Sequence, residues 1–352
     1  MSTVIDLFCG VGGLTHGLGL AGLNVIAGID LDSSCKYAYE HNNIATKFIL
    51  ADVSEFGPEK IAELYPENGL RILVGCAPCQ PFSKYTHRYR KGEQRDNRWK
   101  LLHSFSDIIS HVLPDVVSME NVPELANEQV FIDFSDTLIQ LGYSVSYSIV
   151  YCPEYGVPQN RRRLVLLASR LGELTLVESL FKESDYPTVR ESIGELPHVS
   201  AGVKNNVDLM HSASGLSPIN LLRIRSSVQG GTWRDWDDSL KLECHKKDSG
   251  KTYMSIYGRM CWDEPSPTIT TQFYGYGNGR FGHPEQDRAI TLREGALLQS
   301  FPLDYDFIDP AAGFNRRKIG THIGNAVPVE LGRAIGISIK NHIAEVNHEN
   351  RK

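Results

Sequence analysis

The chain has 352 residues, of which 41% are hydrophobic and 22% charged, and its net charge is −6. This composition excludes a wholly disordered protein, and at roughly 150 residues per domain the length indicates about two domains. No run approaches the roughly 18 apolar residues that a membrane span needs, and seven cysteines without a secretion signal indicate reduced thiols, so we expect a cytoplasmic protein that makes no membrane contact.

Short apolar runs alternate with amphipathic segments through the first half of the chain. The apolar runs are bounded by Gly, Asp or Pro and predict strands at Val4–Phe8, Asn24–Ile29, Phe48–Leu50, Ile72–Val74, Val116–Ser118, Ser144–Val150 and Leu164–Ala168. Helices are expected near 13–21, 33–42, 58–65, 99–112 and 129–141. This alternation predicts an α/β fold with a doubly wound, mainly parallel sheet that helices cover on both faces.

The pattern changes after about residue 175. Residues 176–288 show no lasting helical period and are rich in Gly, Ser, Pro, Asn and aromatic residues, which predicts a second, smaller, loop-rich domain. Helical patterning returns at 291–300 and at 328–345. In the last of these segments apolar residues recur at every fourth position and share one face: Leu331, Ile335, Ile339 and Ile343.

A glycine-rich turn, Asp6–Gly13 (DLFCGVGG), joins the first predicted strand to the first predicted helix. Glycines permit close approach of a ligand to the backbone, and the start of a helix adds positive potential. Asp30, at the end of the second strand, is placed to accept hydrogen bonds from ribose hydroxyls, and Asp52, after the third, from an adenine amino group. The pattern favours an adenosine ligand and leaves NAD, S-adenosylmethionine and a merely structural turn open.

Cys79 is a candidate nucleophile in Gly75–Ser83 (GCAPCQPFS), where Pro78 and Pro81 stiffen the backbone around it. The segment follows the fourth strand, at the carboxyl edge where doubly wound sheets hold their ligands. The spacing Cys76-x-x-Cys79 fits a redox pair, half of a zinc site, or a chance spacing beside one catalytic thiol. The chain has no second Cys-x-x-Cys, which weakens the zinc interpretation, so we expect no metal.

Glu120 ends the fifth predicted strand, within Val116–Val122 (VVSMENV). It should lie on the same edge of the sheet as Cys79. A carboxyl group beside a thiol suits attack on a ring that must also be protonated. The alternatives for Glu120 are a helix cap and an ion pair with an arginine.

Together these segments resemble the cytosine-5 DNA methyltransferase family, of the bacterial or phage modification type. Six blocks stand in the family's order over nearly the whole chain: the glycine turn at 6–13, Pro78-Cys79-Gln80, Glu120-Asn121-Val122, Gln159–Arg163 (QNRRR), Arg293–Pro302 (REGALLQSFP) and Gly324–Pro328 (GNAVP). Cys9 stands where small residues are common in the family, which we expect to be harmless. The resemblance implies a Rossmann-like catalytic domain at 1–175 and 289–352, with a target-recognition domain at 176–288.

The resemblance also implies S-adenosylmethionine as the cofactor. By motif position Phe8 would stack near the adenine, Asp30 would bind the ribose and Asp52 the adenine edge. Further cofactor contacts are implied for Gly10, Gly12, Gly13, Leu31, Val53, Pro78, Leu101, Asn325 and Ala326.

The implied reaction begins with the Cys79 thiolate, which adds to carbon 6 of cytosine and raises the electron density at carbon 5. Glu120 would hydrogen-bond the ring nitrogen and the exocyclic amine. Arg163, together with Arg161, would hold the base carbonyl or the nearby backbone.

The implied partner is double-stranded DNA, from which the cytosine must be flipped out. Residues 80–98 carry six Lys and Arg against two Asp and Glu, which favours phosphate contacts on an otherwise acidic protein, although a solvated surface is the alternative. Ser83 and Tyr85 are expected to touch the vacated base stack. We expect a monomer that works beside a cognate restriction endonuclease in a restriction-modification system.

Three rival functions stay open from the sequence. The first is a tRNA cytosine-5 methyltransferase, which shares the catalytic blocks. The second is a non-catalytic DNA-binding regulator on the same scaffold. The third is an NAD-dependent or thiol-redox enzyme, which only the glycine turn and Cys-x-x-Cys suggest.

Overall fold

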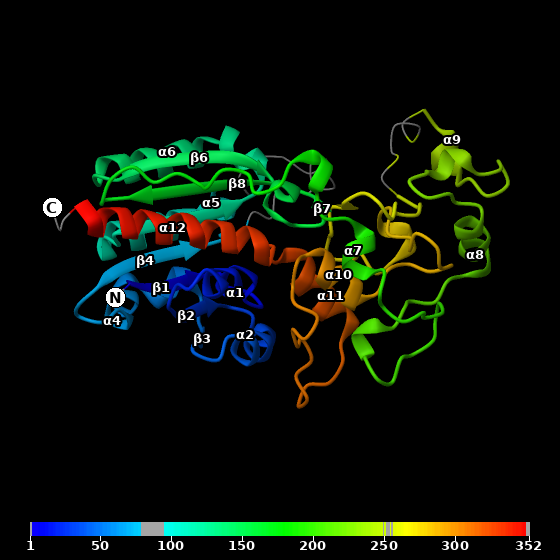
Figure 1. Ribbon diagram of the computed structural model, residues 1–352, viewed down its shortest axis with the longest axis horizontal. Coiled ribbons are helices and arrows are strands. Elements are labelled where there is room, and N and C mark those ends of the chain that lie inside the picture. The colour runs from blue at the N-terminus through cyan, green and yellow to red at the C-terminus, as the bar shows by residue number, and fades with distance from the viewer. Residues whose placement is uncertain (1, 79–94, 249, 251–253, 255, 350–352) are drawn as a thin grey trace. The chain divides into compact units, whose positions relative to one another are not determined.

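The computed structural model describes residues 2–78, 95–248, 250, 254 and 256–349, except the side chains of 95–98 and 349. The chain forms two compact units (Figure 1). Unit 1 consists of Met1–Tyr151, Arg162–Ser179 and Val327–Lys352, and unit 2 of Cys152–Arg161 and Leu180–Ala326.

Unit 1 is built on a seven-stranded sheet in the order β3-β2-β1-β4-β5-β8-β6. Its strands are β1 (Ser2–Leu7), β2 (Val25–Asp30), β3 (Lys47–Leu50), β4 (Leu70–Gly75), β5 (Val116–Asn121), β6 (Ser144–Tyr151) and β8 (Arg162–Ser169). β1 to β5 pair in parallel, whereas β8 runs antiparallel to both β5 and β6. The predicted mainly parallel sheet is therefore confirmed. Its strand order reverses between β1 and β4, the switch point outside which such sheets bind ligands.

Helices cover both faces of this sheet (Figure 1). They are α1 (Gly13–Leu20), α2 (Lys36–Asn42), α3 (Val53–Phe56), α4 (Pro58–Leu64), α5 (Arg95–Val112), α6 (Gln129–Gln140) and α12 (Val329–Glu349). The helix α5 packs with α3, α4 and α6 on one side, and α1 packs with α12. At Gly17 in α1 a β-carbon would clash with the carbonyl oxygen of Val329, so only glycine permits this close approach.

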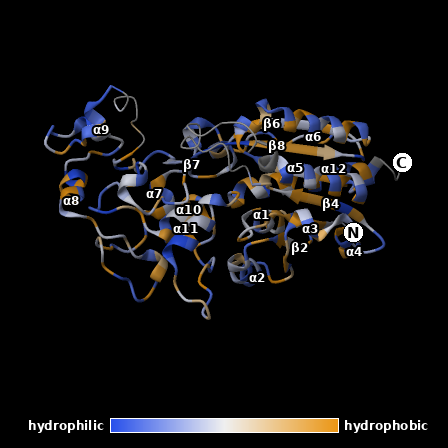
Figure 2. Ribbon diagram, turned by 180° about the vertical axis from the view of Figure 1, so that it is seen from behind, coloured by the Kyte–Doolittle hydropathy of each residue, from blue (hydrophilic) through white to orange (hydrophobic). Residues whose placement is uncertain are grey.

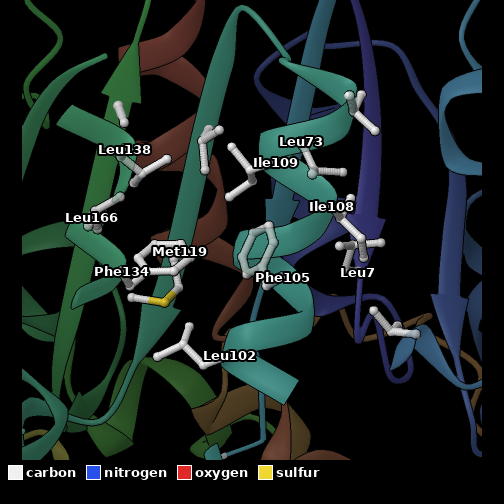
Figure 3. Packing of buried hydrophobic residues seen from close by; sticks show 14 of the residues in the cluster. Leu7, Leu73, Leu102, Phe105, Ile108, Ile109, Met119, Phe134, Leu138 and Leu166 are labelled. Atoms are coloured by element: carbon white, nitrogen blue, oxygen red, sulfur yellow. The ribbon is translucent and has the colours of Figure 1, made fainter. Parts of the chain in front are cut away.

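The core under α5 and α6 explains why the strands are nearly all apolar. Figure 3 shows Leu7 and Leu73 on the side of Phe105 of α5, and Met119 and Leu166 on the side of Phe134 of α6. Figure 2 shows the same apolar character along β4 and β8. Since successive strand residues point to opposite faces, a strand covered on both sides needs apolar residues at every position.

Unit 2 has little regular structure, as expected for a loop-rich region. It contains β7 (Gln159–Asn160) paired with β9 (Ser266–Pro267), and the helices α7 (Val189–Ile193), α8 (Pro218–Arg225), α9 (Glu243–Lys246), α10 (Leu292–Leu298) and α11 (Arg316–Asn325). Side chains take the place of strand pairing. Arg259 is buried, forms an ion pair with Asp287, and donates to the carbonyl oxygens of Ile224, Ser227, His283 and Gln286.

The compact units divide the chain differently from the domains expected from the sequence. Residues 289–326 were expected with the catalytic domain, but they belong to unit 2, where α10 packs against α7 and α11. Residues 152–161 also belong to unit 2 because β7 pairs with β9 there. Among the described residues, no helix is long and apolar enough to cross a lipid bilayer.

Candidate active site

The glycine turn leaves the carboxyl end of β1 in an unusual backbone conformation. Phe8 has a φ of 59°, Gly10 of 51° and Gly12 of 90°. Positive φ is uncommon for a residue with a side chain, and such positions cluster at functional sites. Phe8 was expected to end the first strand, but the strand stops at Leu7.

Asp30 is fixed against this turn. Its Oδ2 accepts a hydrogen bond from the Gly10 amide at 2.8 Å, and its Oδ1 accepts one from the Asp32 amide at 2.8 Å. Leu31, next in sequence, is 68% exposed, which is high for a large apolar side chain. The end of β2 therefore presents a carboxylate and an apolar side chain together, a combination that suits a nucleoside.

Asp52 caps the short helix α3. Its Oδ1 accepts hydrogen bonds from the Ser54 amide at 2.8 Å and the Ser54 hydroxyl at 2.7 Å, and these bonds lower the pKa of the Asp52 carboxyl. They use one of the two oxygens, so the carboxylate can accept further donors. Val53 is buried beneath it, and Leu101 is half-buried on α5.

Asp6 lies at the end of β1 below the glycine turn and is fully buried. Its Oδ2 accepts a hydrogen bond from the Thr15 hydroxyl at 2.7 Å, whereas its Oδ1 has no hydrogen-bond partner among the described residues. Burial, followed by the charge of Asp30, raises the pKa of Asp6 to about 7. The sequence did not single out this carboxyl as a buried acid.

We expect Asp6→Asn to flatten the pH dependence of stability. The folded chain holds a proton on Asp6 that the unfolded chain, with a pKa near 3.8, has already released. This stabilisation is therefore complete below about pH 4 and is lost as the pH rises through about 7, at roughly 1.4 kcal/mol per pKa unit. Measured by urea unfolding, the free energy of unfolding should fall more between pH 5 and pH 8 in the unmodified protein than in the variant.

Asp136→Asn is the matched control for this experiment, since Asp136 is exposed on α6. It should leave the difference between pH 5 and pH 8 as it is in the unmodified protein. The same difference in all three proteins would contradict the assignment.

The segment after β4 is held at the switch point by its neighbours. The Cys76 amide donates to the Leu7 carbonyl at 3.3 Å, and the Asn121 side chain donates to the Ala77 carbonyl at 3.0 Å. Pro78 is exposed. Cys79 lies outside the described residues, as do Ser83, Tyr85 and the basic residues up to Lys91. The structure therefore places Cys76 and Ala77, the residues that precede Pro78 and Cys79, beside the ends of β1 and β5.

Glu120 is 2% exposed at the end of β5 and has two close neighbours. Its Oε1 lies 2.8 Å from Arg163 Nε, an ion pair without the alignment of a hydrogen bond, and its Oε2 accepts from the Cys76 thiol at 2.9 Å. The strand register explains both contacts: Met119 pairs with Gly75, and Asn121 with Leu164. The structure thus brings together Glu120, Arg163 and the segment that leads to Cys79.

Arg161 and Asn325 belong to unit 2. Arg161 is 4% exposed and donates to the Ile269 carbonyl at 3.2 Å, which is a structural contact; its catalytic role stays a prediction. Asn325 is the exposed last residue of α11, and Ala326 caps that helix.

A buried pair of glutamines links three sequence blocks inside unit 2. Gln159 Nε2 donates to Gln299 Oε1 at 2.9 Å, and Gln299 Nε2 donates to the Ile323 carbonyl at 2.7 Å and to the Ala326 carbonyl, inside the third block, at 3.5 Å. Both glutamines are fully buried. Sequence reasoning missed their role, although each stands inside a family block. For Gln299 the available signal was a polar residue directly after the apolar run Ala296–Leu298, whereas Gln159 stands among polar neighbours and gave no such signal.

Known proteins resemble this chain over nearly its whole length. The family model described as C-5 cytosine-specific DNA methylase matches residues 2–341. The chain is 53% identical over 354 residues to the Type II methylase M.HgiDII of Herpetosiphon aurantiacus, which covers 100% of this chain and 98% of that one. It is 30% identical over 357 residues to the Type II methyltransferase M.Eco47II of Escherichia coli, with 98% and 80% covered.

Solved structures share the fold. The structure of a candidate DNA modification methyltransferase from an Escherichia coli prophage superposes with a TM-score of 0.74 at 21% identity, covering 98% of this chain and 100% of the other. An Entamoeba histolytica methyltransferase gives a TM-score of 0.67 at 16% identity, covering 97% and 99%. The resemblance that the six sequence blocks carried is confirmed: the chain belongs to the C-5 cytosine-specific DNA methylase family.

Proposed function

We propose that the protein transfers a methyl group from S-adenosylmethionine to carbon 5 of a cytosine flipped out of a specific duplex DNA sequence. The observation that carries this proposal is the buried Glu120 carboxylate, paired with Arg163 and in contact with the segment that leads to Cys79. A buried carboxylate and an arginine beside a thiol suit a ring that must be held, charged and attacked.

The cofactor site that we propose lies along the carboxyl ends of β1, β2 and β4. The turn has positive φ at Phe8, Gly10 and Gly12, and Asp30 keeps lone pairs for ribose hydroxyls beyond its two amide bonds. When bound, S-adenosylmethionine supplies an electrophilic methyl group on a sulfonium. The residues assigned to this site in unit 1 are Phe8, Gly10, Gly12, Gly13, Asp30, Leu31, Asp52, Val53, Pro78 and Leu101, and the family motif also assigns Asn325 and Ala326 to the cofactor.

The chemistry follows from the weak nucleophilicity of cytosine carbon 5. The Cys79 thiolate forms a bond to carbon 6, and the electron pair of the carbon 5–carbon 6 double bond becomes available at carbon 5. Glu120 holds the ring nitrogen and the exocyclic amine while charge develops there, and Arg163 steadies the carboxylate and the base carbonyl. After carbon 5 has received the methyl group, it loses its proton, the sulfur–carbon bond breaks and the double bond reforms. Arg161 is the second arginine that the motif assigns to this step.

The DNA contacts that we propose divide between two regions. The basic residues from Lys84 to Arg98 bind phosphates around the flipped base, which costs a few kcal/mol to extrude. The range 176–288, which lies in unit 2 from Leu180 onward, recognises the target sequence. Because the relatives are named as type II methylases, we further propose that the enzyme protects DNA from a cognate restriction endonuclease. We also propose that it acts as a monomer.

Exchange of Arg88 and Arg90 for glutamine is expected to weaken DNA binding and to reduce its salt dependence. Each lost phosphate contact lowers the slope of log affinity against log salt by about 1. Titrations of a labelled duplex at several salt concentrations measure that slope. The control replaces Lys47 and Lys60, which are exposed in unit 1, and should leave the slope as it is. An unchanged slope in the Arg88 and Arg90 variant would count against phosphate contacts by this segment.

Methyl incorporation into duplex DNA and into tRNA, measured side by side, tests the proposed function. Incorporation into DNA alone is expected. Transfer to tRNA alone would favour the rival function of a tRNA cytosine-5 methyltransferase. Binding to DNA without methyl transfer to either nucleic acid would favour the non-catalytic DNA-binding regulator. Mapping of 5-methylcytosine in host DNA after expression then identifies the target sequence.

A further inference from the structure

The thiol of Cys76 contacts the carboxylate that the proposed mechanism uses. Cys76 Sγ lies 2.9 Å from Glu120 Oε2, and Arg163 lies on the other oxygen of the same group. The contact joins residues 44 positions apart, each one place beyond the paired ends of β4 and β5. It is therefore a product of the sheet register and not of local chain geometry.

The electrostatics of this contact make Cys76 a donor. A thiolate at Cys76 would face the negative Glu120 carboxylate at 2.9 Å, and like charges at that distance repel each other strongly. The Cys76 thiol is therefore protonated and donates its hydrogen to Oε2. This also gives the two sulfurs of Cys76-x-x-Cys79 different roles, since the nucleophile needs a thiolate, whereas Cys76 is a hydrogen-bond donor.

The burial of Glu120 makes the donor important. Glu120 is 2% exposed, so solvent does little to orient its carboxylate. The Arg163 contact lacks the alignment of a hydrogen bond and leaves rotation of the carboxylate open, whereas a hydrogen bond at Oε2 fixes that rotation. A thiol is a weak donor, so it can orient Oε2 and still give way when the target base forms a hydrogen bond with this oxygen.

We infer that Cys76 is a positioning residue, which orients the Glu120 carboxylate for the target base through its thiol hydrogen bond. This inference rests on the proposed function. Without the donor, Oε2 would be buried and unpartnered, and Glu120 would meet the base in a mixture of orientations. The rate of transfer then falls, while the contacts that bind DNA and cofactor persist.

The test begins with Cys76→Ala and Cys76→Ser in the full chain. We expect Cys76→Ala to lower kcat about tenfold, the size of one lost hydrogen bond to a charged group, with both KM values within about twofold. Cys76→Ser restores a donor and should recover most of kcat. Ser110→Ala, which removes a hydroxyl donor on α5, is the control and should turn over normally. If Cys76→Ala does not fold, Cys76→Val, which fills the site without a donor, takes its place.

A double-mutant cycle with Glu120→Gln then separates positioning from packing. Because Cys76 acts through the carboxylate, the Cys76→Ala exchange should change little in a Glu120→Gln background. The cycle is measured on single-turnover rates and on equilibrium affinity for a target duplex with S-adenosylhomocysteine, which needs no turnover. Equal losses in both backgrounds, or no recovery by serine, would overturn the inference. Failure of the unmodified chain to methylate DNA would instead count against the proposed function.

Discussion

Replacement of Cys79 by serine is expected to abolish methyl transfer while DNA binding survives. A serine hydroxyl is a far weaker nucleophile at neutral pH than a thiolate, so addition to carbon 6 should slow by more than about a thousandfold. Tritium transfer from labelled S-adenosylmethionine to a target duplex measures the loss. Gel-shift titration with the same duplex should give an affinity close to that of the unmodified protein.

A duplex with 5-fluorocytosine at the target position makes the same prediction visible as a covalent species. Fluorine at carbon 5 cannot leave as a proton does, so the sulfur–carbon bond should persist and the protein should migrate with the DNA on a denaturing gel. The Cys79→Ser protein should form no such species. Cys244→Ser, which exchanges an exposed thiol, should still be trapped. Trapping of the Cys79→Ser protein would refute the assignment of the nucleophile.

The second large effect is expected for Glu120→Gln. Glutamine keeps the shape of the side chain but removes the negative charge that faces Arg163 at 2.8 Å. Preorganised groups aimed at developing charge contribute about 10²- to 10³-fold each, so the single-turnover rate should fall by about that factor. Binding of DNA and of the cofactor should change little, because the loss falls on the transition state.

Glu124→Gln is the matched control for this experiment, since Glu124 is an exposed carboxylate four residues further along the chain. It should retain the rate of the unmodified protein. A Glu120→Gln rate within about threefold of normal would show that the carboxylate does not serve the chemical step.

The sheet of unit 1 could be predicted because its strands are apolar over their whole length. Ile5, Leu73 and Val117 come from such runs, and all are fully buried in the structure. The helix α11 was not predicted, because only Ile319 and Ile323 mark its buried face among charged and polar neighbours. Unit 2 resisted prediction for a different reason. Its loops are held by side chains such as Arg259, whose carbonyl acceptors lie up to 35 positions away in sequence.

In the candidate site, too, some features could be predicted from the sequence and others depend on contacts between distant parts of the chain. Glu120 could be assigned from its place at the end of a predicted strand, and an ion pair with an arginine was one alternative for it, but the sequence did not say that the arginine is Arg163. The contact with Cys76 could not be predicted, since it depends on β4 and β5 being neighbours in register. Likewise the raised pKa of Asp6 depends on how completely the fold buries this carboxyl, and a sequence pattern carries no measure of burial.

The packing of α12 against α1 through Gly17 has a consequence for folding during translation. The helix α1 ends at Leu20 and the helix that covers it begins only at Val329, so α1 leaves the ribosome well before α12 has been made. At about 5–20 residues per second, the nascent chain therefore waits tens of seconds with Leu18 and its neighbours uncovered. Termination of translation before Val329 should therefore leave the apolar face of α1 uncovered and yield a chaperone client rather than a partial enzyme.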